Sequence, residues 1–232
     1  MMEMLKDKKY IRVILQSILV FFLFYYGRYF QLIPIFLFHI DTKSLSEEAG
    51  IYLSIFSNVF ILILLFLIYY RELKIEWKKF REHTLQNLDA GFRYWFLGLV
   101  GMASSNIILN IFLNAGGATN EKMVQSMITT LPLVMLLNAG VLAPIIEELT
   151  FRKAFRNIFQ KKWFFILFSG IVFGGLHVIT SFTTPLELLY IIPYSALGIS
   201  FAYMYYKTDT IFTSISIHMF HNIALILLSI LV

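Results

Sequence analysis

The sequence predicts an all-α fold, a polytopic transmembrane helical bundle of about seven spans, with six to eight as the range. Composition is the first reason: 59% of the 232 residues are hydrophobic and only 14% are charged, and the mean hydropathy is +0.75. Soluble domains contain about 45–50% apolar and about 25% charged residues. The second reason is a series of apolar stretches of about 20 residues, the length of helix that crosses about 30 Å of hydrocarbon.

The hydropathy pattern places these spans at definite positions along the chain. We expect them at about residues 13 to 38, 51 to 70, 94 to 113, 125 to 151, 163 to 180, 187 to 206 and 211 to 232. The first is too long and too aromatic for a cleaved signal peptide. Because no repeat or soluble segment separates the spans, we treat residues 1–232 as a single integral membrane domain.

Basic residues fall almost entirely on alternate loops. They precede the first span, lie between the second and third and between the fourth and fifth, and follow the sixth; the other side carries Lys43 and Lys122, and Arg28 lies within a span. The positive-inside rule therefore predicts a multi-pass cell-membrane protein with a cytoplasmic N-terminus, which includes Lys6, and an extracytoplasmic C-terminus. Because these charges are explained by topology, the net charge of +5 does not predict a nucleic-acid partner.

Two segments that connect the spans have predicted structures. Residues 71–93 mix basic and apolar side chains, which fits either an interfacial amphipathic helix bound to anionic lipid or an ordinary cytoplasmic loop. Residues 114–120, NAGGATN, are predicted as a plain turn.

Ionisable residues inside the spans are the clearest sign of function. Each costs about 2.5–3.5 kcal/mol at mid-bilayer even on the lenient insertion scale. Among the acidic residues only Glu147 and Glu148 interrupt apolar sequence, and the buried imidazoles are His177, His218 and His221. The absence of cysteine excludes a thiolate nucleophile, so the attacking group is expected to be an oxygen or a water.

Helical spacing divides these residues into roles. Residues four apart share a face, so Glu148 is expected to pair with Arg152, while Glu147 points about 100° away and stays free for chemistry. His218 shares its face with Asn222. His221 is interpreted as a packing residue outside the site.

Depth brings the groups together. Counted from a turn at Lys161 and Lys162, Glu147 and His177 both lie roughly 20 Å along their helices. Phe173 lies one turn below His177. Three spans are therefore expected to present Glu147, His177, and His218 with Asn222 to one polar chamber. Gly140 and Pro144 are expected to loosen the helix and so to help water enter this chamber.

Three motifs in order give a resemblance. EELTFR from Glu147 to Arg152 fits EExxxR, Phe173 to His177 fits FxxxH, and His218 to Asn222 fits HxxxN. This pattern resembles the CAAX-protease and bacteriocin-processing (CPBP) group of membrane peptidases, also called the abortive-infection family, which includes the type II CAAX prenyl endopeptidases. The resemblance covers about residues 125–225 and makes the C-terminal four-helix core the catalytic region.

The resemblance implies a glutamate-dependent intramembrane endopeptidase acting on a peptide or membrane-protein precursor, as in peptide maturation or bacteriocin self-immunity. By carry-over, Glu147 would activate a water with the help of His177, while His218 and Asn222 would bind the oxyanion. Glu148, Arg152 and Phe173 would support the site. Fixed donors in a low dielectric stabilise a tetrahedral intermediate well, which agrees with these roles.

Some alternatives stay open on the sequence. We favour a mechanism without a cofactor, because no HExxH helix is present, but Glu147 or Glu148 with His177 and His218 could hold zinc. A non-catalytic membrane scaffold or regulator of a sensor or immunity system is a second function, and an ion-coupled transporter with a buried Glu and His relay is a third. Oligomeric state is not predicted; membrane lipid is an expected partner.

Overall fold

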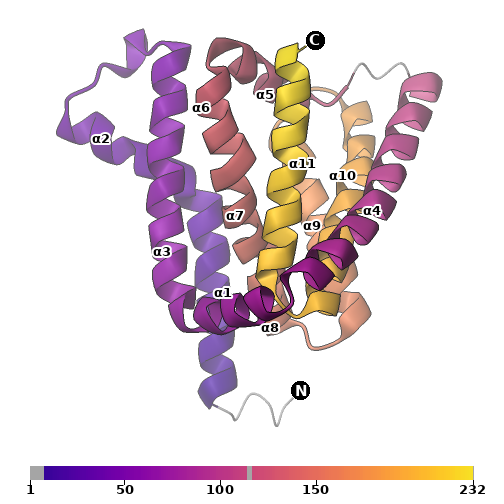
Figure 1. Cartoon of the computed structure of the whole chain (residues 1–232). Coiled ribbons are helices and arrows are strands. Elements are labelled where there is room, and N and C mark those ends of the chain that lie inside the picture. The colour runs from indigo at the N-terminus through magenta and orange to yellow at the C-terminus, as the bar shows by residue number, and fades with distance from the viewer. Residues whose placement is uncertain (1–7, 114–116, 232) are drawn as a thin grey trace.

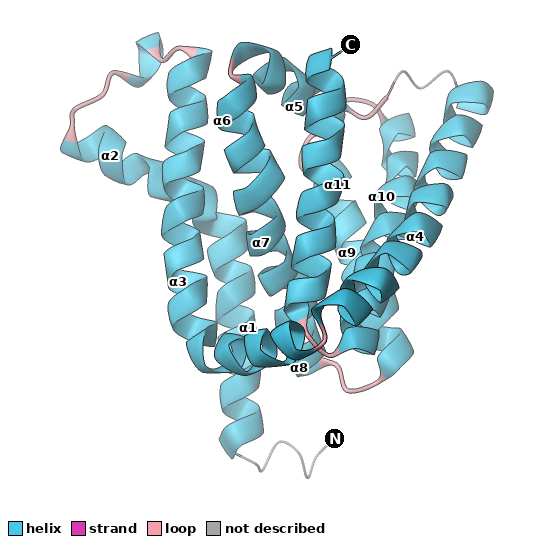
Figure 2. Ribbon diagram, in the orientation of Figure 1, coloured by secondary structure: helices cyan, strands magenta, loops and turns pink. Residues whose placement is uncertain are grey.

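The computed structural model describes residues 8–113 and 117–231, and these residues form a helical bundle without strands. Figure 2 shows helices throughout, and Figure 1 places the N- and C-termini at opposite ends of the bundle. Seven helical stretches are long and apolar enough to cross a membrane. The predicted fold class is therefore confirmed. Lys6 and residues 114–116 of the predicted turn lie outside the described residues.

Several spans are built from more than one helical piece. The first comprises α1, η2 and α2, the fourth runs from α6 to α8, the sixth joins η6 to α10, and the others are single helices. In chain order the elements are α1 (Lys8–Tyr26), η2 (Gly27–Gln31), α2 (Leu32–Leu37), η3 (Thr42–Ser44), α3 (Glu47–Glu82), α4 (Thr84–Leu113), α5 (Thr119–Thr130), α6 (Pro132–Leu137), η4 (Asn138–Leu142), α7 (Ala143–Glu147), η5 (Glu148–Ala154), α8 (Phe155–Ile158), α9 (Lys162–Ile179), η6 (Pro185–Tyr190), α10 (Ile191–Thr208) and α11 (Ile211–Leu231).

The fourth span begins later than the sequence pattern indicated. Residues 119–130 form the separate helix α5, and the span starts at Pro132 rather than near residue 125. Leu131 leaves the helical region, with φ −140° and ψ 73°. Proline disfavours the α conformation in the residue before it and lacks an N–H for the helix ladder. The break therefore follows from Pro132, a signal that the hydropathy pattern obscured.

Residues 71–93 are helical, so the interpretation of this segment as an ordinary loop is wrong. Helix α3 continues to Glu82, His83 interrupts it, and α4 starts at Thr84. The junction lies across the end of the bundle that carries the N-terminus (Figure 1). Phe80 is buried there, whereas Trp77 and Leu85 are exposed.

A buried ionic cluster centred on Glu76 lies at the start of α11. The sequence pattern did not indicate it, because only Glu147 and Glu148 interrupt apolar sequence. The Glu76 carboxylate binds Lys153, accepts a hydrogen bond from Tyr205 Oη at 3.2 Å, and accepts one from the Ile211 backbone N at 2.6 Å. It thus caps the first turn of α11, where a negative charge is favourable. Glu187, also buried, binds the Thr119 backbone N at 3.0 Å.

The short connection between α10 and α11 is held by charge. Asp209 has φ 50° at the end of α10 and lies 2.6 Å from Lys79 Nζ. Partial burial disfavours the charged carboxylate, but the hydrogen bond and charge of Lys79, joined by Arg156, outweigh this effect and lower the pKa of Asp209 below its ordinary value. This contact therefore joins the end of α3 to the start of the last span.

Helices α9 and α10 pack at backbone distance, which fixes the position of His177 on α9. A Cβ atom at Gly174 would lie 2.6 Å from the Ser195 backbone N, and one at Gly170 would lie 2.6 Å from the Ile199 backbone N. Small residues allow such close approach between membrane helices. At Gly175 the nearest atom would be Ile179 Cδ1 at 3.6 Å, an ordinary contact.

We expect Gly174→Ala to destabilise the bundle by about 1–3 kcal/mol, because the added methyl group overpacks against backbone that cannot yield. Gly175→Ala is the matched control and should be neutral or slightly stabilising, since alanine favours a helix. Thermal unfolding of both variants in detergent measures the difference. Equal melting temperatures would contradict the close packing of α9 on α10.

Candidate active site

The candidate site lies in a cavity of about 710 Å³ between the helices of the C-terminal half and α4. We call this cavity the central chamber. Its wall includes the four residues that the sequence assigned to chemistry, Glu147, His177, His218 and Asn222, together with Phe173. They come from α7, α9 and α11, so the chamber forms only where these helices meet.

The helix that carries the carboxylates is irregular on both sides of Glu147. Elements η4 and η5 are π-helical, with the five residues of α7 between them. Pro144 lies in the first turn of α7 and cannot donate a backbone hydrogen bond. π-Helical turns are frequent at functional sites because they redirect side chains and leave carbonyls unpaired. Here the Ala139 carbonyl is bonded by Asn222 Nδ2 at 2.8 Å.

Glu148 lies at the centre of a fully buried group. Its Oε1 lies 2.9 Å from His218 Nδ1 and 3.4 Å from Arg152 Nη1, and the side chains of Glu148 and Arg152 have no exposed surface. Arg152 also donates to the Gly198 carbonyl at 3.2 Å. The i,i+4 pair expected from the sequence is therefore present, and it fixes His218 as well.

Aromatic rings enclose this group. The Arg152 guanidinium lies 4.3 Å from the centroid of the Phe173 ring. His218 stacks on Phe201 at 4.6 Å, and Phe173 contacts His177 at 4.3 Å between centroids. Cations are attracted to ring faces, most strongly where water is excluded. Phe173 thus separates the buried ion pair from the His177 side of the site.

Glu147 faces the chamber between two imidazoles. Its Oε1 lies 3.8 Å from His177 Nε2, and its Oε2 lies 3.6 Å from His218 Nε2. The side chains of His177 and Glu147 are 22% and 15% exposed, in contrast to buried Glu148. Glu147 is therefore the carboxylate that a substrate in the chamber can reach.

The Nδ1 atoms of His177 and His218 each have a hydrogen-bond partner. His177 Nδ1 lies 2.9 Å from the Phe173 carbonyl, which can only accept, so this nitrogen carries a hydrogen. His218 Nδ1 faces the Glu148 carboxylate, which favours a hydrogen there too. Both rings therefore turn Nε2 towards Glu147. The separations from Glu147 exceed a direct hydrogen bond of about 3.2 Å, and a water can bridge such gaps.

Two chamber residues, and a third residue that contacts one of them, were missed or placed elsewhere by the sequence. His221, interpreted as outside the site, lines the chamber and its Nδ1 accepts a hydrogen bond from Trp95 Nε1 at 3.3 Å. Tyr194 stacks on His177 at 5.2 Å between centroids. With 13 tyrosines in the chain, nothing in the sequence distinguishes this one, and Trp95 belongs to a span without a motif.

Zinc was the alternative that the sequence left open, with Glu147 or Glu148, His177 and His218 as ligands. Among the described residues, no three His, Asp or Glu side chains form a group that could hold an ion. His218 Nδ1 and Glu148 bind each other, and the Arg152 guanidinium beside them places a positive charge where a divalent cation would be repelled. Only Glu147 and the two Nε2 atoms remain facing the chamber.

Comparison with known proteins is consistent with this site. Residues 129–224 match the family model described as type II CAAX prenyl endopeptidase Rce1-like. The matched segment contains EExxxR, FxxxH and HxxxN, and the resemblance predicted from these motifs is confirmed. The match lies within the region of about residues 125–225 that the sequence assigned to the core.

Two bacterial relatives are also similar. YdiL of Bacillus subtilis (strain 168), whose name assigns it provisionally to the membrane peptidases, is 31% identical over 106 residues, which are 44% of this chain and 40% of YdiL. UPF0177 protein YxdF of Lactococcus lactis subsp. lactis (strain IL1403) is 26% identical over 166 residues, 68% of this chain and 85% of that protein. This chain therefore aligns with less than half of YdiL. No solved structure matches.

We expect Glu148→Ala to reduce the free energy of unfolding by about 3–5 kcal/mol, because it leaves the Arg152 guanidinium buried without a counter-charge. Glu82→Ala is the control: Glu82 is exposed, 3.9 Å from Lys78, and such pairs contribute about 0–1 kcal/mol. Thermal unfolding in detergent compares the two. If both variants melt together, Glu148 does not hold the core.

Proposed function

We propose that the protein is an intramembrane endopeptidase that hydrolyses a peptide bond of a membrane-associated peptide or protein precursor. The observation that carries the proposal is the Glu147 carboxylate at the chamber wall, between the Nε2 atoms of His177 and His218. The family match over residues 129–224 supports the same class of activity. Peptide maturation and bacteriocin self-immunity are the uses that the family resemblance suggests.

In the proposed reaction Glu147 is the general base. A water held by Glu147 and the His177 Nε2 lone pair attacks the scissile carbonyl carbon, and its proton passes to Glu147. The carbonyl oxygen becomes an oxyanion. The C–N bond then breaks as the proton on Glu147 moves to the leaving nitrogen, which yields a carboxylic acid and an amine and restores the Glu147 carboxylate.

The oxyanion needs donors fixed in advance, and α11 offers two. His218, with Nδ1 on Glu148, donates from Nε2 when it carries both protons, and the Glu148 carboxylate stabilises that imidazolium. Asn222 Nδ2 has one hydrogen on the Ala139 carbonyl and a second for the substrate. Donors held in a site with little water stabilise developing charge without reorganising, an effect of about 2.7–4 kcal/mol per donor.

Glu147→Gln should lower the rate of cleavage by about 10²–10⁴-fold, since the amide cannot accept the proton of the water. The protein should still fold, because Glu147 is outside the buried ion pair. The membrane peptidomes of cells with wild type, Glu147→Gln and the exposed control Glu82→Gln give the readout. Cleavage products that persist in Glu147→Gln would refute the general-base role.

We further propose that no metal takes part, because Arg152 already neutralises Glu148 and the His218 ring is held by its hydrogen bond to Glu148. Purified wild type treated with a strong chelator should retain its activity on a substrate identified from the peptidome. A loss that zinc restores would overturn the metal-free mechanism. Elemental analysis of the purified protein provides an independent measurement.

A further inference from the structure

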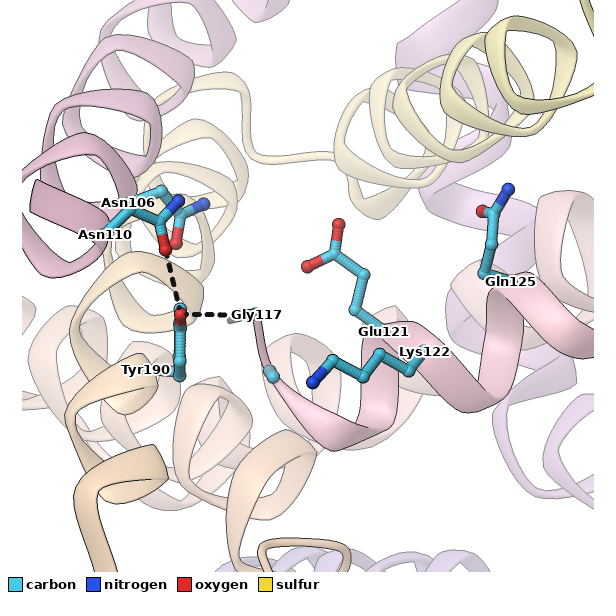
Figure 3. A pocket seen from close by; sticks show the side chains of 8 residues that line it. Asn106, Asn110, Gly117, Glu121, Lys122, Gln125 and Tyr190 are labelled. Carbon is cyan, nitrogen blue, oxygen red and sulfur yellow. Dashed lines mark hydrogen bonds between the residues drawn. The ribbon is translucent and has the colours of Figure 1, made fainter. Parts of the chain in front are cut away.

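A second cavity of about 790 Å³ lies next to the central chamber, and we call it the vestibule. Figure 3 shows its lining side chains, which come from α4, α5 and η6 and from the segment before α5. Tyr190 forms part of its wall: its hydroxyl donates to Asn110 Oδ1 at 3.1 Å and accepts from the Gly117 backbone N at 3.0 Å. The two cavities adjoin, because they share four lining residues: Asn106, Glu121, Gln125 and Tyr190.

The contacts between α4 and α11 show where the chamber is closed and where it widens. Trp95 bonds to His221, and Phe92 packs on Phe220 at 5.1 Å between centroids. Both contacts use the first half of α4. Beyond them the chamber separates the helices, and Met102 and Leu225 line it from the two sides. Figure 1 shows α4 diverging from α11 towards the end that carries the C-terminus.

The vestibule lies at the end of the bundle opposite most of the basic residues. It is lined by α5 and the end of α4. The end of α3, the turn between α8 and α9, and the end of α10 carry Lys79, Lys161 and Lys207, and Figure 1 shows these segments at the end with the N-terminus. Basic residues collect on the cytoplasmic side of membrane proteins. The opening of the chamber is therefore on the extracytoplasmic side.

The charged residues that line the vestibule differ from those that line the central chamber beside it. The exposed Glu121 lines both cavities, while Lys122 lines the vestibule alone. Figure 3 shows the Glu121 carboxylate extending into the open space. Among the described residues Glu121 forms no ion pair within 4.0 Å. A group that passes from the vestibule into the chamber thus meets a carboxylate that is not engaged in an ion pair among the described residues.

We propose that the vestibule is the extracytoplasmic entrance for the substrate, and that Glu121 favours segments that present a positively charged group there. The apolar wall of the chamber, with Met102, Leu225 and Leu228, accommodates the hydrophobic part of the same segment. The substrate class is then a peptide, or a segment of a membrane protein, that is exposed at the outer leaflet with an apolar stretch beside a basic one. This inference rests on the proposed function for the identity of the substrate, but its geometry can be tested without any cleavage assay.

The side of the opening can be tested by cysteine labelling, because the chain contains no cysteine. In intact cells a membrane-impermeant maleimide should label Glu121→Cys and the chamber residue Ser229→Cys, whereas Lys161→Cys should react only after permeabilisation. The reverse pattern would overturn the proposal. The result is the same whether or not the protein is a peptidase, so failure of the entrance and failure of the function are distinguishable.

The charge preference can be tested at Ser229→Cys with two small thiol reagents, the cationic trimethylammonium-ethyl and the anionic sulfonatoethyl methanethiosulfonate. Adding Glu121→Gln should lower the ratio of cationic to anionic reaction rates on the order of threefold, as expected for one charge in a partly solvated entrance. Glu48→Gln, which removes an exposed carboxylate on the same face outside the vestibule, should leave the ratio unchanged. An equal ratio in all three backgrounds would refute the role of Glu121.

Discussion

The rest of the core depends on the contacts of the buried Glu148 carboxylate with Arg152 and His218. It neutralises Arg152 within its own helix and bonds His218 from α11. A charge at this depth is costly in hydrocarbon. Removal of Glu148 or Arg152 would leave the other buried without a counter-charge. The position of α11 against η5 is therefore set by electrostatics as well as by packing. Because His218 points Nε2 at Glu147 only while Nδ1 is held, the same contact orients the chemical residues.

A second ionic centre supports the same arrangement at the start of α11. Glu76 binds Lys153, the residue after Arg152, and caps the first turn of α11. The fourth and seventh spans are thus connected at two places. Glu76 of α3 joins Lys153 to the first turn of α11, and Glu148 bonds His218 at the depth of the site. This double connection fixes both the rotation and the height of α11. Helix α9 is placed differently, by glycine contacts with the backbone of α10.

The two carboxylates differ because of the helix that carries them. Glu147 ends α7 and Glu148 begins the π-helical η5, so adjacent residues face opposite environments. One lies on the chamber wall and the other has no exposed surface. Catalysis by a carboxylate requires access to water, whereas the pairing of a buried charge requires its exclusion. The irregular fourth span meets both needs in neighbouring residues, at the point where Pro144 and η4 interrupt the α-helical ladder.

The amino-acid pattern alone predicts the all-helical membrane architecture, the presence of seven spans and the grouping of Glu147, Glu148, Arg152, His177 and His218. These follow from local rules, namely apolar run length, i,i+4 spacing and the cost of charge in lipid. The burial of Glu76, the contact of Trp95 with His221, and the place of His221 and Tyr194 in the chamber wall are seen only in the packed bundle. These features depend on which faces of distant helices meet, and an apolar span shows no periodic contrast that would indicate its inward face.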